Sequence, residues 1–318
     1  MRLAFIKCHG SGNDFPLIDA RGLAVDEEAW PGVARALADR RGPVGGDGLL
    51  LLTEGDASHE FGMRMFNPDG SEAETCLNGL RCVARLGFER LGLESATVRL
   101  RTSSVAVARD PALAPGVETI RETAGPADRR VAGWLRGIDG DELIEGVIAM
   151  LPGTHAFTAV AMPNPHLVSF VERIDEAELV AIGDICETAP SWLPTRANVS
   201  FVERRGTATL FVRTFERGVG LTDSCGSAMA ASAHVACLLG HARFGETLTI
   251  LNKGGLVRAQ AMRDGMVSLS GNATFEWEGS AEIDPARGIA GAVAIASHHN
   301  DEIAAWARVA EAATAIAS

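Results

Sequence analysis

The sequence predicts a mixed α/β protein built from two similar lobes, and three observations support this prediction. The chain has 318 residues, which is enough for two domains of roughly 150 residues each. Apolar residues make up 47% of the chain and charged residues 22%, with 35 glycines, which is typical of a globular protein with helices and strands. The third observation is an internal repeat that divides the chain near its middle.

The repeat consists of matching residues at a nearly constant offset. The segments "MRMFN" and "VRTFE" align, and each precedes a polar loop that ends in a cysteine. The matching positions lie 149 to 151 residues apart: Arg64 and Arg213, Phe66 and Phe215, Cys76 and Cys225, Asn13 and Asn164, Gly48 and Asn198. We infer an N-terminal lobe at 1–128, a C-terminal lobe at 129–278 and a C-terminal extension at 279–318.

Each lobe is expected to contain the same series of elements. A short strand, an asparagine loop, a helix and a second strand lead to the loop that ends in cysteine, and a second helix follows. Apolar spacing predicts the first helices at 33–40 and 176–182, and strands at "GLLLL" and "NVSFV". The second helices, "LNGLRCVARLGFERLG" and "GSAMAASAHVACLLG", both end at a glycine.

The C-terminal extension at 279–318 is predicted to be helical, and its helical pattern is clearest from residue 301, with Asn300 as the cap. Its apolar residues recur near one helical face: Ile303, Trp306, Val309, Ala313 and Ile316. Such a helix would dock on the body of the protein, support a homodimer, or form a free extension. The sequence leaves these three alternatives open.

Cys76 and Cys225 are the leading candidates for catalysis. Each lies just before or within the first turn of a buried helix, where unpaired N–H groups can bind a carboxylate and favour a thiolate. If a pseudo-two-fold axis relates the lobes, the two cysteines converge on one cleft. One thiolate would remove an α-hydrogen while the other thiol delivers a proton to the opposite face, which describes a two-base racemase or epimerase.

No cofactor is expected for this reaction. An imine to pyridoxal phosphate would need a lysine, and the chain has only Lys7 and Lys253, without a phosphate-binding glycine-rich loop beside Lys253. Main-chain N–H groups would instead stabilise the charge that develops on the substrate carboxylate. The other four cysteines are expected to be buried packing residues: Cys8, Cys82, Cys186 and Cys237.

Composition narrows the partners and the compartment. The net charge of −12 and the scarcity of lysine argue against nucleic acid or an anionic membrane and favour a small-molecule substrate. The sequence has no Cys-x-x-Cys pair, so no metal is expected. It also has neither a signal-peptide apolar run nor a stretch of ~20 apolar residues. We therefore expect a cytoplasmic protein with free thiols.

The motifs together resemble the diaminopimelate epimerase family. The resemblance covers about residues 9–278 and rests on "GSGNDF", "FNPDGSEAETCLNGLRC", "NPHLV", "RANVSFV" and "RTFERGVGLTDSCGSA". It implies a cofactor-independent isomerase that interconverts LL- and meso-diaminopimelate on the route to lysine and peptidoglycan. It also implies two lobes, each a mixed, largely antiparallel curved sheet around a central helix, with the active site in the cleft between them.

The resemblance also implies roles for individual residues. Cys76 and Cys225 would be the acid/base pair. Backbone N–H groups after each cysteine would hold the reacting carboxylate: those of Asn78, Gly79, Gly226 and Ser227. Further substrate-binding positions are Asn13, Asn67, Asn164, Asn198, Glu216 and Arg217. Arg217 suits a distal carboxylate and Glu216 an ammonium group, and His166 and Glu216 match positions that tune the cysteines.

Three positions depart from the family pattern. Leu77 and Ala228 stand where glycine is usual, and Leu221 stands where glutamate is common. Glycine tolerates positive φ and close approach by a ligand, so a requirement for either at Leu77 would alter the carboxylate pocket.

Two alternative functions are consistent with the sequence. The first is a cofactor-independent racemase of another amino acid, of the proline, hydroxyproline or histidine type. Glu216 and Arg217 argue against it, because a substrate without a distal amino acid head group would leave that charge pair idle. The second is a non-catalytic amino-acid-binding or thiol redox protein, which a readily formed cross-link between Cys76 and Cys225 would favour.

Overall fold

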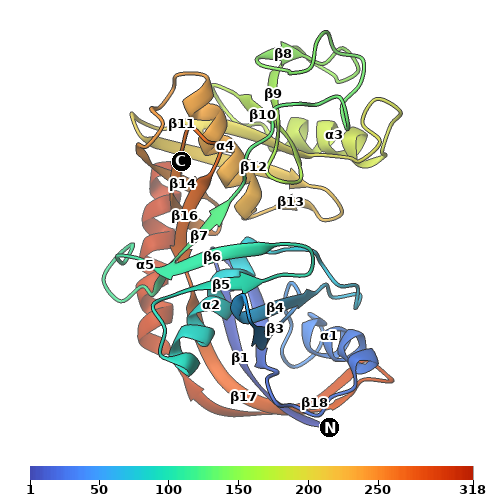
Figure 1. The fold of residues 1–318 in the computed structure, drawn as a ribbon, viewed down its shortest axis with the longest axis vertical. Helices are drawn as coiled ribbons and strands as arrows, with labels where there is room; N and C mark the ends of the chain where they lie inside the picture. Colours follow the sequence, from blue (N-terminus) through green and yellow to red (C-terminus); the bar gives the residue numbers. More distant parts are fainter. Residues whose placement is uncertain (318) are drawn as a thin grey trace. The chain divides into compact units, whose positions relative to one another are not determined.

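The computed structural model describes residues 1–317, and its fold mixes α-helices with extensive β-sheet (Figure 1). The chain divides into two compact units. Unit 1 comprises Met1–Glu122 and Ser270–Val309, and unit 2 comprises Thr123–Leu269 with the segment that begins at Ala310. The predicted fold class, mixed α and β, is confirmed.

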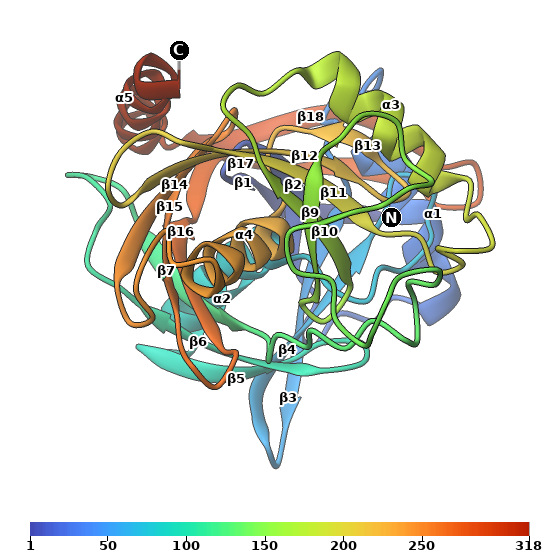
Figure 2. The ribbon, with the colours of Figure 1, turned by 90° about the horizontal axis from the view of Figure 1, so that it is seen from above.

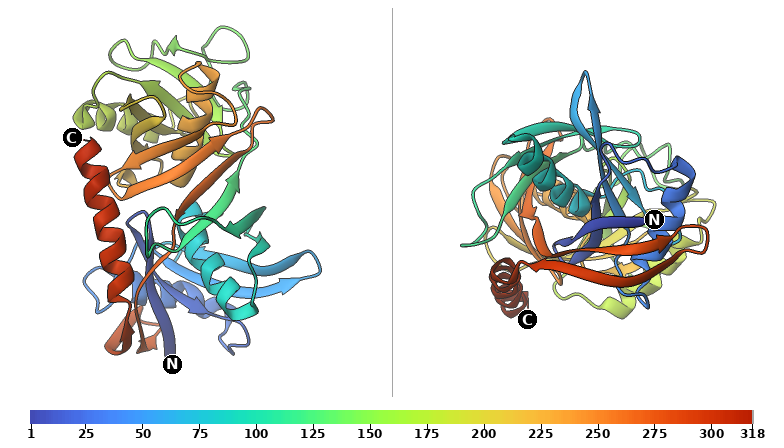
Figure 3. Two further views of the ribbon diagram at one scale, coloured as in Figure 1. Left: turned by 90° about the vertical axis from the view of Figure 1, so that its left-hand side faces the viewer. Right: turned by 90° about the horizontal axis from the view of Figure 1, so that it is seen from below.

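Unit 1 is organised around α2 (Leu77–Leu91), the helix that follows Cys76. Strands β1 to β6 all pack against it (Figure 3), and every residue from Leu77 to Phe88 is buried. The helix ends at Gly92, whose φ of 68° glycine adopts without strain. The other elements of this unit are β1 (Arg2–Gly10), β2 (Asn13–Asp19), η1 (Glu27–Ala29), α1 (Trp30–Ala38), β3 (Leu49–Asp56), β4 (His59–Phe66), β5 (Ser95–Arg99), β6 (Ser104–Arg109), β7 (Thr119–Ala124), β17 (Thr274–Asp284) and β18 (Ile289–His298).

Unit 2 is organised in the same way around α4 (Gly226–Leu238), the helix that follows Cys225. Strands β9 to β12, β14 and β15 pack against α4 (Figure 2). The other elements are β8 (Gly146–Val147), β9 (Ala156–Ala161), β10 (Pro165–Phe170), α3 (Glu176–Glu187), β11 (Asn198–Arg204), β12 (Thr209–Glu216), β13 (Gly220–Thr222), β14 (Thr247–Asn252), β15 (Gly255–Ala261) and β16 (Val267–Asn272).

The two units repeat one pattern of strand pairing. In unit 1, β1–β2 is antiparallel, β2–β3 parallel, β3–β4 antiparallel, β4–β5 parallel and β5–β6 antiparallel. The strands β9, β10, β11, β12, β14 and β15 of unit 2 have the same relations in the same order. The pairing register also recurs. Leu51 of β3 pairs with Arg64 of β4, and in unit 2 Phe201 of β11 pairs with Arg213 of β12, the residue that the repeat aligns with Arg64. This agreement supports the internal duplication that the sequence indicates.

The segment after residue 278 differs from the prediction. Position 278 lies inside β17, which pairs along β1 from Arg2 to His9 and so belongs to unit 1. Residues 279–284 and 289–298 are strand rather than helix. In β17 the buried residues Gly279, Ala281 and Ile283 alternate with more exposed ones. This alternation is the pattern of a strand with one buried face, not of a helix. The boundary near residue 128 also shifts, to Glu122 and Thr123 within β7.

The helix predicted at the end of the chain is present as α5 (Asn300–Ala317). Its buried face is formed by Ala305, Trp306, Val309 and Ala313. Ile303 was predicted on this face but is 37% exposed, because it lies about a quarter-turn away from it. Ile316 is 52% exposed, beyond the last buried residue. Within residues 1–317, no helix is both long and apolar enough to cross a membrane.

Candidate active site

Cys76 occupies the N-cap position of α2, with an extended backbone (φ −149°, ψ 103°). The Gly79 N–H donates to Cys76 Sγ at 3.4 Å, and the Cys76 thiol donates to Asn13 Oδ1 at 3.7 Å. The sulfur therefore stands where a side-chain oxygen usually caps a helix. The partial positive charge of the helix N-terminus favours a negative charge at this position.

Asn13 is oriented toward Cys76 by a residue that was not predicted. Its amide nitrogen donates to Asp47 Oδ2, and the same carboxylate oxygen accepts the Asp14 N–H at 3.1 Å. Because Asp47 takes the amide nitrogen, the amide oxygen of Asn13 is turned toward the thiol. In the sequence, only the glycine-rich "GGDG" segment around Asp47 indicated a special position.

The other predicted residues of unit 1 lie in two places. Asn78 and Gly79 are buried in the first turn of α2, and Asn78 Oδ1 accepts from Arg81 Nη2 at 2.9 Å. Asn67 lies in the loop between β4 and α2, where its side chain donates to Ser71 Oγ at 2.9 Å. The structure thus brings Asn13, Asn78 and Gly79 around Cys76, and places Asn67 in a turn closed by its own neighbours.

Cys225 is the N-cap of α4, with a similar extended backbone (φ −128°, ψ 113°). Asn198 Nδ2 donates to Cys225 Sγ at 3.9 Å, and the sulfur lies 3.5 Å from Ser227 Oγ. Cys225 is only 7% exposed, whereas Cys76 is half-buried. The two thiols therefore share a position on their helices but differ in their access to solvent.

The pKa of the Cys225 thiol is raised well above its usual range. Burial is the main cause, and the negative charge of Glu216 raises the pKa further. Hydrogen bonds from Ser227 and from the Ala228 backbone act in the opposite direction. Because burial dominates, the neutral thiol is the favoured form of Cys225.

His166 and Asn198 face each other across the parallel pair β10–β11. His166 is fully buried, and its Nε2 lies 3.1 Å from Asn164 Oδ1. Burial, followed by the positive charge of Arg217, lowers the pKa of His166 to about 3, so the imidazole is neutral near pH 7. Asn198 Oδ1 accepts the Arg217 backbone N–H at 3.0 Å. Asn198 therefore links Cys225 to the residue expected to bind the distal carboxylate.

The Arg217 side chain is half-buried, and its Nη1 donates to the Thr195 carbonyl at 3.2 Å. Glu216, which precedes it at the end of β12, is close enough to raise the pKa of Cys225. Gly226 is the first residue of α4, and Ser227 follows it. The structure thus gathers the predicted residues of unit 2 around Cys225 and the end of β12.

The three departures from the family pattern have simple structural consequences. Leu77 begins α2 in helical conformation and is buried, so this position does not require the positive φ of a glycine. Ala228 is fully buried in the first turn of α4. Leu221 lies on β13 and packs against the apolar core of unit 2 beside Phe215.

Comparisons with known proteins match most of the chain. A family model described as Diaminopimelate epimerase matches residues 5–108 and 158–276, and these segments contain all of the predicted site residues. The chain is 38% identical over 290 residues to a diaminopimelate epimerase of Clostridium acetobutylicum, covering 89% of this chain and 87% of the relative. It is 36% identical over 289 residues to a diaminopimelate epimerase of Listeria monocytogenes, covering 87% of each.

Among solved structures, a hydroxyproline epimerase from Agrobacterium vitis with bound trans-4-hydroxy-L-proline is similar in fold. The TM-score is 0.63 over 90% of this chain and 94% of that one, at 13% identity. At this identity the likeness shows a common fold and carries no information about the substrate.

Proposed function

The chain belongs to the diaminopimelate epimerase family, and on this premise we propose that Cys76 and Cys225 are the acid/base pair that interconverts LL- and meso-2,6-diaminopimelate. Members of this family are isomerases, and so is this chain. One observation supports the pairing above the others: each thiol is the N-cap of a central helix, in two units with the same strand pairing.

In the proposed reaction each of the two sulfurs acts on one face of the substrate α-carbon. N–H groups in the first turns of α2 and α4 bind the adjacent carboxylate and stabilise the negative charge that develops as the α-hydrogen leaves. One sulfur, as thiolate, takes this hydrogen as a proton. The other, as thiol, gives its proton to the opposite face of the carbon. The centre is inverted, and the two cysteines exchange protonation states.

The charges around the cysteines support a starting assignment. Cys225 is buried beside Glu216, and its raised pKa keeps the proton on the sulfur. Cys76 is half-buried at the positive end of α2 and contacts Gly79 N–H. We assign proton donation to Cys225 and proton abstraction to Cys76 in the form of the enzyme described here. The reverse reaction starts from the opposite protonation states.

Recognition of the distal amino acid head is assigned to residues at the end of β12. Arg217 suits the distal carboxylate, because guanidinium and carboxylate pair through two parallel hydrogen bonds. To bind it, Arg217 Nη1 would exchange the Thr195 carbonyl, now 3.2 Å away, for the substrate. Glu216 has two proposed tasks, binding of an ammonium group and control of the Cys225 proton. The further substrate-binding assignments are Asn13, Asn67, Asn164 and Asn198, with His166 as a tuning residue.

We also propose a cytoplasmic location and a homodimer. The two-thiol reaction requires reduced cysteines, which a reducing compartment maintains. The homodimer is a prediction that size-exclusion chromatography with light scattering would test directly.

The direct test of the function is incubation of the purified chain with LL-diaminopimelate in deuterated water, with reductant and without added cofactor. The expected result is formation of the meso isomer with deuterium at one α-carbon, seen by NMR and chiral chromatography. Turnover of proline, hydroxyproline or histidine in place of diaminopimelate would move the assignment to another racemase on this fold.

A further inference from the structure

Arg81 is a fully buried arginine on α2, one turn after the residues that surround Cys76. A buried guanidinium needs partners for its charge and its five donors. Its hydrogen bonds are Nε to Asn272 O at 3.1 Å, Nη1 to Glu122 Oε1 at 2.7 Å, Nη2 to Ser11 Oγ at 3.1 Å and Nη2 to Asn78 Oδ1 at 2.9 Å. One side chain therefore ties together four segments of unit 1.

Two of these four partners lie in the segments that hold the contacts of the Cys76 sulfur, Gly79 and Asn13. Asn78 lies in the first turn of α2, two residues after Cys76. Ser11 lies in the turn between β1 and β2, with φ of 53°, two residues before Asn13, whose Oδ1 accepts from the Cys76 thiol. Arg81 thus joins the helix end that carries the cysteine to the turn that presents its hydrogen-bond acceptor.

The end of β1 and the first turn of α2 are packed in direct contact. A Cβ atom on Gly10, at the end of β1, would lie 2.4 Å from Asn78 O and 3.0 Å from Arg81 Nη2. A methyl group at this position would clash with the helix backbone, so β1 rests directly on the first turn of α2. The end of β1, three residues before Asn13, is therefore packed against the first turn of α2 and the Arg81 side chain.

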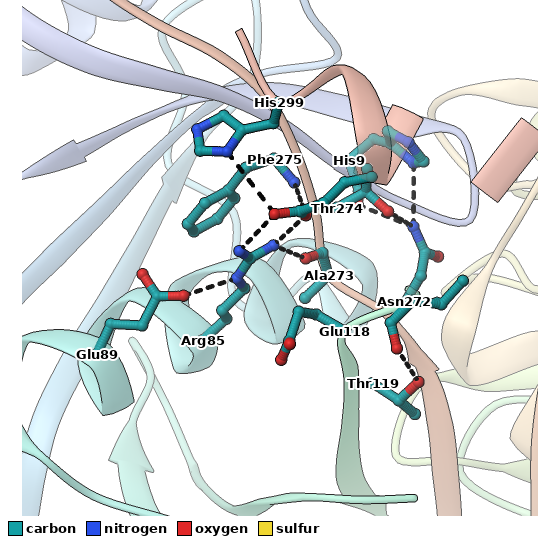
Figure 4. Close-up of polar contacts among 12 residues, drawn as sticks. His9, Arg85, Glu89, Glu118, Thr119, Asn272, Ala273, Thr274, Phe275 and His299 are labelled. Carbon is teal, nitrogen blue, oxygen red and sulfur yellow. Dashed lines mark hydrogen bonds and ion pairs between the residues drawn. The ribbon is translucent and has the colours of Figure 1, made fainter. Parts of the chain in front are cut away.

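Asn272 holds the same turn from the other side. Its Oδ1 accepts the Ser11 N–H at 2.7 Å, and its Nδ2 donates to the His9 carbonyl at 3.2 Å. Figure 4 shows the Asn272 side chain directed toward His9. The carbonyl of Asn272 is also an acceptor for Arg81, so the two residues act on the turn as one network.

We propose that Arg81 is a positioning residue that holds the first turn of α2 and the Asn13 turn at the separation that Cys76 needs for proton transfer. This inference deepens the proposed function, because it rests on Cys76 being an acid/base group. Arg81 acts through Asn78 and Ser11. Its loss is therefore expected to change the reactivity of the Cys76 sulfur as well as the rate of epimerisation.

The buried ion pair between Arg81 and Glu122 allows the role of Arg81 to be tested without leaving an unpaired charge. Glu122 is fully buried against it, and burial raises the pKa of Glu122 to about 7 although Arg81 acts to lower it. Removing only Arg81 would leave an unpaired buried acid and destabilise the fold, whereas replacing both members of a buried ion pair by apolar residues is often neutral or stabilising. The double variant Arg81→Met/Glu122→Leu therefore removes the positioning contacts while preserving the packed core.

Arg85 provides the matched control on the same helix. It is one turn further along α2, is 6% exposed, and donates to Glu89 Oε1 at 2.9 Å and to Ala273 O at 2.8 Å (Figure 4). It also forms an ion pair with Glu302 of α5. The variant Arg85→Met/Glu302→Gln removes a comparable ion pair but leaves the contacts of Asn78 and Ser11 in place.

The experiment measures kcat and KM in both directions, together with the rate of Cys76 alkylation by iodoacetamide at fixed pH, with Cys225 as the internal reference. For Arg81→Met/Glu122→Leu we expect kcat to fall about 100-fold, since an ångström of misplacement can have this effect, with KM changed less. The ratio of Cys76 to Cys225 alkylation should change at least about five-fold, because the N–H groups and the acceptor around the sulfur move. The Arg85 control should leave both quantities near those of the unaltered protein.

Three outcomes would overturn the positioning role: a folded double variant with unaltered kcat, unaltered alkylation alongside lost turnover, or equal losses in the Arg85 control. If the double variant does not fold, Arg81→Lys replaces it, since lysine keeps the charge but lacks the fork that reaches all four acceptors. Alkylation does not depend on the substrate. If the proposed function is wrong, the protein without substitutions will not turn over diaminopimelate. The ratio of Cys76 to Cys225 alkylation will still decide the role of Arg81.

Discussion

The two cysteine sites occupy equivalent places in the two units but have different surroundings. Cys76 is half-buried and contacts two neutral groups, the Gly79 N–H and the Asn13 amide. Cys225 is buried and close to the negative charge of Glu216. Duplication of the scaffold thus accounts for the equivalent places of the two sulfurs, and burial together with Glu216 raises the pKa of Cys225. This asymmetry suits a reaction that needs one base and one acid at the same time.

The helices that carry the cysteines are also held differently. Arg81 braces the first turn of α2 through Asn78, whereas the position 149 residues later, Ala230 on α4, has only a methyl group and is fully buried. Small residues allow α4 to pack closely against its strands. The unit with the more exposed sulfur therefore has the more elaborate polar support, and this difference can be tested by mutation.

The largest effect is expected from removing either sulfur. Cys76→Ala and Cys225→Ala should each lower epimerisation at least about 1,000-fold, because one face of the substrate then lacks its acid or base. Cys82→Ala and Cys237→Ala are matched controls, because both thiols are buried inside the same two helices, and they should mainly lower the melting temperature. Conversion of LL- to meso-diaminopimelate is the measurement. Full activity in either of the first two variants would exclude the two-base scheme.

The next largest effect is expected at Arg217, the residue of unit 2 that we propose binds the distal carboxylate. Replacing a charge partner in a desolvated contact weakens it by about 2–5 kcal/mol, or roughly thirty-fold to several-thousand-fold in kcat/KM. Arg217→Met should show a loss in this range with LL-diaminopimelate. Arg204→Met, at an exposed position near the end of β11, is the control. Equal values of kcat/KM for the two variants would remove the reason for preferring a substrate with a distal carboxylate.

A smaller effect, but one specific to Cys225, is expected from Glu216→Gln. Loss of the negative charge removes one cause of the raised pKa of Cys225, so the limb of the kcat/KM profile governed by this thiol should move to lower pH. The rate at the optimum should fall roughly ten-fold, less than the effect of losing a whole general acid or base. The control is Glu187→Gln, because Glu187 holds the same hairpin through Gly218 N–H at 3.0 Å. An unmoved limb with a raised KM would mean that Glu216 acts on the substrate alone.

The smallest effect concerns stability and compares one buried histidine from each unit. Burial lowers the pKa of His9 to about 4 and that of His166 to about 3. In the unfolded chain a histidine has a pKa of about 6.5, so above this pH each imidazole is neutral in both states and the folded state keeps its full stability. As the pH falls from about 6.5 toward the folded-state pKa, only the unfolded chain takes up a proton, and the free energy of unfolding decreases. His9→Asn and His166→Asn should each flatten the decrease in unfolding free energy between about pH 6.5 and 4. Urea denaturation at several pH values measures this slope, with the exposed His298→Asn as control. A slope unaltered in both variants would contradict the assignment.

Much of the fold and part of the site could be predicted from the sequence. The helices after Cys76 and Cys225 and the terminal helix follow from spacing between nearby residues, and the structure contains all three. The two-unit organisation follows from the repeat at an offset of 149 to 151 residues, although the bounds of the units differ from the prediction. Such features are local, because a helix needs only a periodic apolar face and a cap. The strand at 279–284 was missed, because its partner β1 lies at the other end of the chain.

That two cysteines lie at two helix starts follows from their positions along the chain alone. Their surroundings depend on how distant segments of the chain fold together. Asp47 reaches Asn13 across 34 residues, Arg81 reaches Glu122 across 41, and Ser11 reaches Asn272 across 261. These contacts depend on strand register, on burial and on the turns that bring separate segments together. Burial and neighbouring charge are also what move a thiol pKa, so the raised pKa of Cys225 arises only when the chain has folded.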